Sequence, residues 1–111
     1  MGFNYEYNCS LERVVDGDTV DCVVDLGFRI QTRQRFRLLG IDAAEPRGAD
    51  RARGLAATEY LTACLKGARL MVRTEKSDSF GRWLADFYVD GDSESVSQKM
   101  IAGGHAVRIA G

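Results

Sequence analysis

Hydrophobic and polar residues alternate along the first quarter of the chain, as they do in half-buried β-strands. Between Thr19 and Leu26 every second residue is apolar, and acidic residues occupy the opposite face, which is the period of two expected of a strand. The preceding segment, Tyr5 to Val15, also reads as a strand, but its apolar positions change side near Leu11, which indicates a bulge. The sequence Asp16-Gly17-Asp18 between them predicts a tight turn.

A long third strand is predicted from Phe28 to Ile41, after a turn at Gly27. Its faces are Phe28, Ile30, Thr32, Gln34, Phe36 and Leu38 on one side, and Arg29, Gln31, Arg33, Arg35 and Arg37 on the other. Like charges on one face repel one another unless carboxylates or anions lie across them. We expect Asp21 and Asp25 of the preceding strand to pair with Arg29 and Arg33. An anion-binding role is assigned to Arg37, with Arg35 as a second candidate.

An apolar stripe with helical spacing follows the polar segment 47–53. Its members are Ala57, Leu61, Cys64, Leu65 and Ala68, and they predict a helix over about 55–66. Two strands are predicted at 69–74 and 82–89, followed by a short helix capped by Ser97 and an extended segment at 105–109. This order predicts an α+β, mainly β architecture: a five-stranded Greek-key barrel with a helix between strands three and four and a short C-terminal helix. The length predicts a single domain, 1–111.

Composition bounds the environment of the chain. No segment approaches the roughly 18 apolar residues of a membrane span, so we expect no membrane partner. The first residues lack a basic region followed by an apolar run. We therefore expect a cytoplasmic protein, and a secreted mature form that has lost its signal remains open. Three cysteines without metal-binding spacing are expected to be free, mostly buried thiols in a reducing compartment.

The charges are unevenly distributed along the chain. The formal net charge of -1 argues against a protein that holds nucleic acid by bulk electrostatics alone. Arginines outnumber lysines twelve to three, and seven arginines fall between residues 29 and 53. Four aspartates lie just upstream, between residues 16 and 25. This division predicts a basic groove beside an acidic pocket.

The apolar run from Phe36 to Pro46 contains one arginine, and two acidic residues stand near its end. Asp42 offers the hard anionic oxygens that Ca²⁺ or Mg²⁺ prefers. Glu45, three residues on, is placed to deprotonate a water molecule. Arg37 is a permanent cation whose planar fork matches phosphate oxygens. Metal ligand, base and phosphate clamp are the parts needed for phosphodiester hydrolysis.

Two more turns supply similar residues. Asp18 follows the first strand, and Arg82 follows the turn that contains Asp78. If these turns lie at one end of the barrel, Asp18 joins Asp42 on the metal and Arg82 joins Arg37 on the phosphate. Asp16 is expected to accept hydrogen bonds inside its own turn. His105 is the sole histidine, and we expect it at the surface or beside a structural partner, which disfavours histidine-based acid–base catalysis.

Three segments, taken in order, resemble the staphylococcal nuclease (thermonuclease) family over about residues 10–110: Asp-Gly-Asp-Thr-Val, Phe-Arg-Leu-Leu-Gly-Ile-Asp-x-x-Glu, and Gly-Arg-Trp-Leu-Ala. The resemblance implies an OB-type barrel and a calcium-dependent endonuclease that hydrolyses DNA or RNA with low sequence specificity. It implies metal ligation by Asp18, Asp42 and the main-chain carbonyl of Ala43. It also implies Glu45 as the base, with Arg37 and Arg82 stabilising the pentacoordinate phosphate. Mg²⁺ or Mn²⁺ is an alternative to Ca²⁺.

The sequence departs from the family pattern at several positions. Ala43 and Ala44 stand where Thr and Pro are usual, and Ser79 and Phe80 replace a Lys and a Tyr that hold a terminal phosphate, so weaker phosphate affinity is expected. The family's nucleotide-contacting tyrosines and closing C-terminal helix have no counterpart before Gly111. We expect that face to be completed by a second copy in a homodimer, or to be absent. A non-catalytic nucleic-acid- or protein-binding module and a structural subunit of a larger assembly remain alternatives.

Overall fold

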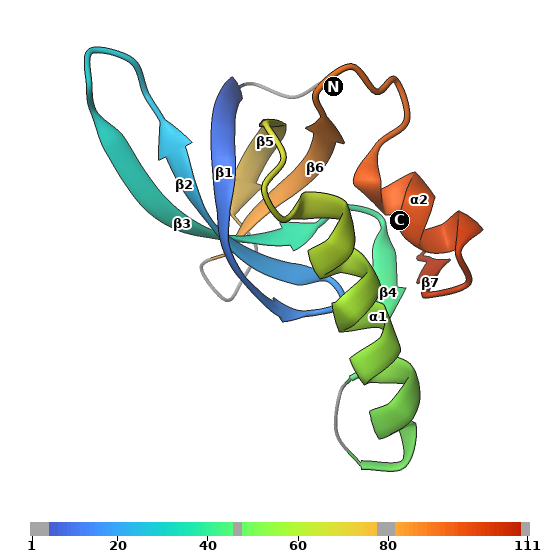
Figure 1. Ribbon diagram of the computed structural model, residues 1–111. Helices are drawn as coiled ribbons and strands as arrows, with labels where there is room; N and C mark the ends of the chain where they lie inside the picture. Colours follow the sequence, from blue (N-terminus) through green and yellow to red (C-terminus); the bar gives the residue numbers. More distant parts are fainter. Residues whose placement is uncertain (1–4, 46–47, 78–81, 110–111) are drawn as a thin grey trace.

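Five strands form a closed barrel in the order β1-β2-β3-β6-β5, and two short strands form a separate pair, β4-β7 (Figure 1). The computed structural model describes residues 5–45, 48–77 and 82–109. The elements are β1 (Tyr5–Asp16), β2 (Thr19–Asp25), β3 (Gln31–Leu38), β4 (Ile41–Ala43), a 3₁₀ turn (Gly48–Asp50), α1 (Arg51–Leu65), β5 (Leu70–Ser77), β6 (Trp83–Val89), α2 (Val96–Ala102) and β7 (Ala106–Arg108). The predicted α+β, mainly β barrel is confirmed.

β1 is long enough to pair with two neighbours. From Tyr5 to Cys9 it pairs with β5, and from Asn8 onward it pairs with β2. The register with β2 shifts between Leu11 and Arg13 and again between Val14 and Asp16, which confirms the predicted bulge. Bulges bend a strand and increase its twist. They therefore let β1 curve across the barrel and close it.

The predicted third strand, 28–41, is wrong at both ends. Phe28 and Arg29 adopt left-handed backbone conformations, with φ of 57° and 62°, so β3 begins only at Gln31. At the other end the chain turns at Gly40, where φ is 79°. After that turn β4 leaves the barrel and pairs antiparallel with β7. The alternation of apolar and polar residues continues through the first turn, and before the second turn it is broken by the adjacent apolar residues Leu38 and Leu39.

The core fills the barrel and the space beneath α1. Phe36 of β3 and Phe87 of β6 meet edge to face inside it, with ring centroids 5.5 Å apart. Helix α1 lies along one side of the barrel (Figure 1) and buries Ala57, Leu61 and Leu65. The helix begins at Arg51, so residues 51–53, predicted as loop, are helical. Their side chains are exposed, and an apolar stripe gives no signal for an exposed first turn.

All three cysteines are free, as predicted. Cys9 and Cys22 are buried and Cys64 is half-buried. A hydrogen bond with Cys9 and burial in the barrel raise the pKa of the Cys22 thiol well above its usual range. Cys22 is therefore protonated and poorly reactive at neutral pH.

Neither α-helix in the described part of the chain is long and apolar enough to cross a membrane.

The N-cap of α2 is Ser95, and the prediction of Ser97 is wrong. The Ser95 side chain accepts a hydrogen bond from the Gln98 backbone N–H at 3.2 Å, and the Gln98 side chain accepts one from the Ser95 N–H at 2.9 Å. This reciprocal pair is a capping box. Ser97 lies inside the helix, where its buried hydroxyl has no hydrogen-bond partner among the described residues.

Replacing the two serines by alanine should therefore have opposite consequences. Ser95→Ala removes a cap and should lower the free energy of unfolding by about 1 kcal/mol. Ser97→Ala removes an unpaired buried hydroxyl and should leave that free energy unchanged or raise it. Urea denaturation of both variants and the wild type measures the difference. A larger loss from Ser97→Ala than from Ser95→Ala would show that the cap lies at Ser97.

Candidate active site

The turn between β1 and β2 lies in a narrow space against β4 and α1. A Cβ atom on Gly17 would come within 2.7 Å of the Cβ of Ala43 and 2.9 Å of the Cβ of Ala57. Only glycine allows so close an approach. Inside the turn, the Asp16 carboxylate accepts a hydrogen bond from the Asp18 N–H at 3.2 Å, as predicted. Gly17 allows the turn to approach β4 closely, and Asp16 holds the backbone of the turn. Together they fix Asp18 beside β4.

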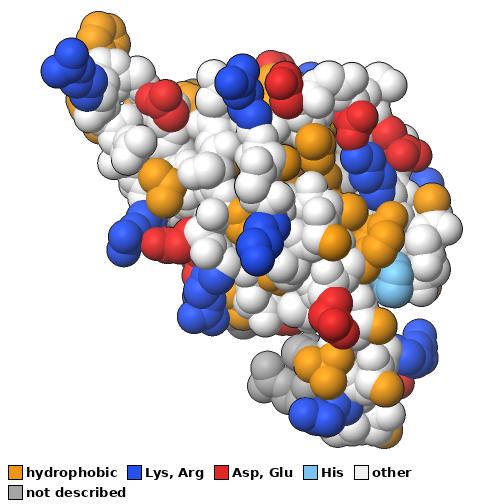
Figure 2. Space-filling view, viewed as in Figure 1, with side chains coloured by type: hydrophobic (Ala, Val, Ile, Leu, Met, Phe, Trp, Pro, Cys, Tyr) orange, Lys and Arg blue, Asp and Glu red, His pale blue; other side chains and the backbone are white. Residues whose placement is uncertain are grey.

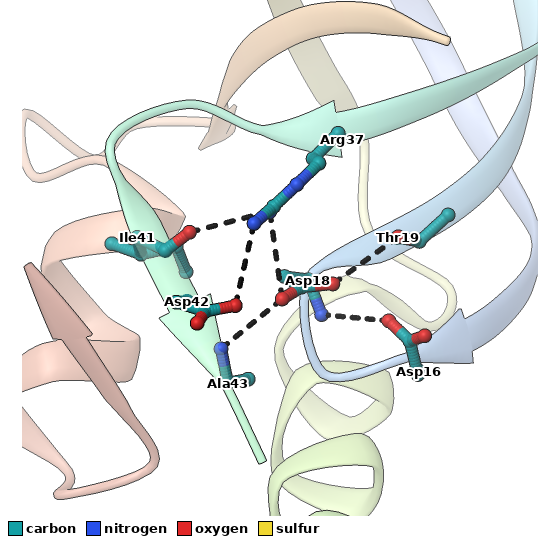
Figure 3. Close-up of polar contacts among 7 residues, drawn as sticks. All are labelled: Asp16, Asp18, Thr19, Arg37, Ile41, Asp42 and Ala43. Carbon is teal, nitrogen blue, oxygen red and sulfur yellow. Dashed lines mark hydrogen bonds and ion pairs between the residues drawn. The ribbon is translucent and has the colours of Figure 1, made fainter. Parts of the chain in front are cut away.

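The carboxylate of Asp18 is almost enclosed, with 8% of the residue exposed. Its Oδ2 accepts a hydrogen bond from the Ala43 N–H at 3.1 Å, and its Oδ1 accepts one from the Thr19 hydroxyl at 3.2 Å (Figure 3). Burial, followed by the contact with Asp16, raises the pKa of Asp18 from 3.8 to about 6. The Ala43 N–H and the Arg37 charge act in the opposite direction without cancelling this effect. Ionised Asp18 is therefore incompletely compensated by the protein.

Arg37 connects the β1–β2 turn to β4. Its Nη1 lies 3.4 Å from Asp18 Oδ2 and donates a hydrogen bond to the Ile41 carbonyl at 3.2 Å. Its Nη2 donates to Asp42 Oδ1 at 3.3 Å. Figure 3 shows the guanidinium between the two carboxylates. The structure thus brings together Asp18, Arg37, Asp42 and Ala43, which come from three separate segments.

The other arginines of β3 pair differently from the prediction. Arg33 pairs with Glu12 of β1 at 3.0 Å, not with Asp21 or Asp25. Asp21 is the partner of Arg35, which donates two hydrogen bonds to it at 2.7 and 3.0 Å. Arg29 lies in the hairpin turn and not on the strand face. The prediction erred because it placed the arginines on one continuous strand and did not consider carboxylates on β1.

Glu45 is exposed and lines a cavity of about 520 Å³ that Asp42 and Ala43 also line. The lining also includes Arg53 of α1 and His105, which follows α2. The His105 ring stacks on Tyr60 of α1, with centroids 4.5 Å apart and planes at 28°. A structural partner was predicted for His105, but its place beside Glu45 was missed. The sequence holds no signal for it, since the pairing of β4 with β7 brings these segments together.

Arg82 immediately precedes β6, whose first residues pair parallel with β3 from Phe36↔Trp83 onward. Trp83 packs against the core and its Nε1 donates a hydrogen bond to Gln34 at 3.2 Å. In this register Arg37 lies opposite Leu84, so Arg82 stands just before the end of β6 that adjoins Arg37. Asp78, Ser79 and Phe80 lie outside the described residues.

A family model for staphylococcal nuclease homologues matches residues 35–110. The chain belongs to this family. The match includes Arg37, Asp42, Ala43, Glu45 and Arg82, while Asp18 lies before it. No curated protein matches the chain. As a staphylococcal nuclease homologue, the chain has the OB-type barrel that the resemblance implied. Membership of a nuclease family makes phosphodiester hydrolysis the first reaction to consider for the candidate site.

Proposed function

We propose that this staphylococcal nuclease homologue is a metal-dependent nuclease that hydrolyses phosphodiester bonds in DNA or RNA with little sequence preference. The observation that carries the proposal is the Arg37 guanidinium held between Asp18 and Asp42, beside a cavity lined by Glu45. Asp42 and Glu45 line this cavity, and Arg37 links Asp42 to the buried carboxylate of Asp18. That combination supports attack of water on a bound phosphate.

The roles follow from the chemistry of each side chain. Arg37 is fixed by Asp18, Asp42 and the Ile41 carbonyl, so its remaining N–H groups would bind phosphate oxygens without further reorganisation. Arg82, which immediately precedes β6, would share the charge that develops on the phosphate. Glu45 is exposed to the cavity and would accept a proton from the attacking water.

The donor atoms suit a hard divalent cation. Asp18 and Asp42 offer carboxylates, Ala43 offers a main-chain carbonyl, and oxygen donors of this kind favour Ca²⁺ over softer metals. The described residues include no cluster of three or more acidic, histidine or cysteine side chains suited to a metal ion, so the proposed set has only two carboxylates. The raised pKa of Asp18 supports a cation here, because a positive ion would compensate its buried charge. A bound Ca²⁺ would neutralise the phosphate, with Mg²⁺ and Mn²⁺ as alternatives.

The test is cleavage of labelled single-stranded DNA, duplex DNA and RNA by the purified chain with Ca²⁺, Mg²⁺, Mn²⁺ or chelator. We expect cleavage with Ca²⁺ and none with chelator. Cleavage that chelator does not affect would contradict metal dependence. Binding of the labelled strands without cleavage under any metal would instead favour a non-catalytic binding module.

Arg37→Ala should reduce the rate of cleavage by roughly 10²- to 10³-fold, because it removes preorganised charge from the phosphate site. The matched control is Arg69→Gln, which removes one positive charge from an exposed position just before β5. Single-turnover rates on the same strand compare the two variants, and thermal unfolding verifies that both are folded. Wild-type turnover in Arg37→Ala would exclude Arg37 from the phosphate site.

A further inference from the structure

The β2–β3 hairpin extends from the candidate active site to the far end of the molecule (Figure 1). Its ladder begins with Thr19↔Arg37 beside the site and ends with Asp25↔Gln31. Beyond that pair the chain turns through Leu26 to Ile30. One continuous hairpin therefore joins the catalytic end to an exposed tip.

The tip presents apolar side chains to solvent. Phe28 is 96% exposed, Ile30 54% and Leu26 41%. The turn is ordered by backbone hydrogen bonds of 2.9 Å between Leu26 N–H and the Ile30 carbonyl, and between Ile30 N–H and the Gly27 carbonyl. Phe28 itself has a left-handed φ of 57°, a conformation that costs energy in a bulky residue. The hairpin holds an aromatic ring away from the protein, and Figure 2 shows hydrophobic and basic side chains at this projecting end.

Guanidinium groups line the outer face between the tip and the site. The side chains of Arg33 and Arg35 are 77% and 48% exposed, whereas their partners Glu12 and Asp21 are 33% and 17% exposed. The carboxylates therefore lie beneath the arginines and orient them. Asp21 also contacts Arg13 at 3.7 Å, so a single acid is shared by two cations. The outermost atoms of this face are positively charged.

We infer that this face is an extended binding track for single-stranded nucleic acid, running from Arg37 past Arg35 and Arg33 to a base-stacking platform at Phe28. The inference rests on the proposed function, because the track is taken to begin at the candidate active site and to run outward from it. Alternate residues of β3 place guanidinium groups in a row from the site outward, and the row spans roughly 13 Å between Arg37 and Arg33. Phosphates along the row and a base on Phe28 would engage a strand longer than the reacting nucleotides.

The side chains of this face are suited to single-stranded nucleic acid. A guanidinium already held by a carboxylate keeps N–H donors for phosphate oxygens and needs little reordering on binding. An exposed ring at the end of a basic face stacks on any base, which suits a substrate with little sequence preference. Duplex DNA offers no free base face to Phe28, so the track favours single strands.

The test compares affinity for two unstructured single strands, one of about 4 and one of about 12 nucleotides, a range typical of such barrels. Binding is measured by fluorescence anisotropy with Ca²⁺ on a Glu45→Gln background, which prevents cleavage. We expect the longer strand to bind at least 10-fold more tightly. Phe28→Ala and Arg33→Gln should each remove most of that advantage. Arg33→Gln should also lower the slope of log affinity against log salt by about 0.7, the loss of one phosphate contact.

Matched controls separate the track from general effects on the surface. Leu55→Ala removes an exposed apolar side chain from α1, and Arg69→Gln removes an exposed charge; both should keep the length advantage. Equal advantages in Phe28→Ala, Arg33→Gln and the controls would overturn the inference. Wild-type cleavage of the 4-nucleotide strand tests the proposed function separately, because that strand is too short to reach the tip.

Discussion

Glu45→Gln is expected to reduce the rate of phosphodiester cleavage by about 10²- to 10⁴-fold, the contribution of a positioned general base. Glutamine keeps the size and polarity of the side chain, but its amide cannot accept a proton from water at neutral pH. Glu45 is exposed and lines the cavity beside Asp42. The substitution should therefore affect the chemical step and leave thermal stability unchanged. Single-turnover rates at saturating Ca²⁺ measure the chemical step directly.

The matched control for this prediction is Glu59→Gln. Glu59 is an exposed acid on α1 and does not belong to the lining of the cavity, so its loss changes the net charge equally without removing the base. A rate for Glu45→Gln within a few-fold of that for Glu59→Gln would exclude Glu45 as the base. His105, which lines the same cavity, would then be the next residue to substitute.

Asp18→Asn should stabilise the protein at pH 7 in the absence of divalent cations, while it abolishes metal-dependent cleavage. The pKa of Asp18 rises from 3.8 to about 6 on folding, chiefly through burial. The folded protein consequently binds a proton more tightly than the unfolded chain, and stability falls as the pH rises through this range. Above pH 6 the buried charge continues to cost energy. Asparagine removes it, with an expected gain of roughly 1 to 2 kcal/mol after allowance for solvent screening.

The pH dependence makes this prediction specific. At pH 4 Asp18 is largely protonated in the folded protein, so the stability advantage of Asp18→Asn should disappear. Asp21→Asn provides the opposite case and should destabilise the protein at pH 7. A hydrogen bond from Arg35 lowers the pKa of Asp21, so the ionised carboxylate stabilises the folded protein above its usual pKa. Thermal unfolding at pH 4 and pH 7 in chelator compares the three proteins. A lower melting temperature for Asp18→Asn than for the wild type at pH 7 would contradict the assignment of a destabilising buried charge.

The sequence predicted the barrel well where a strand buries one face. Val20, Cys22 and Val24 alternate with partly exposed residues in β2, and period-two burial is a local property. The prediction failed where the backbone turns inside a segment predicted as one strand. The strained turn at Phe28 and Arg29 lies within a regular alternation, and the turn at Gly40 follows two adjacent leucines. The segment predicted as one strand therefore contains a hairpin turn, β3 and the start of β4.

The candidate site was predictable for a different reason. Asp18, Arg37 and Asp42 each stand where a strand begins or ends, and their joint order in the sequence indicated one cluster, which the structure describes. The cavity beside the cluster was not predictable. Its lining includes Arg53 and His105, which are brought together by packing of α1 against the segment after α2. No local period or motif records such a contact.

The pairing of β4 with β7 has a consequence for the order of folding. Asp42 lies on a three-residue strand whose ladder partners, Ala106 to Arg108, come from near the end of the described residues, and the Ile109 N–H also binds the Gly40 carbonyl. Closing so long a loop is entropically unfavourable until the barrel provides a surface for it. We therefore expect a nascent chain to form its barrel first. The strand that carries Asp42 is paired only after residues 106–109 have left the ribosome, so the barrel forms before the candidate site is complete.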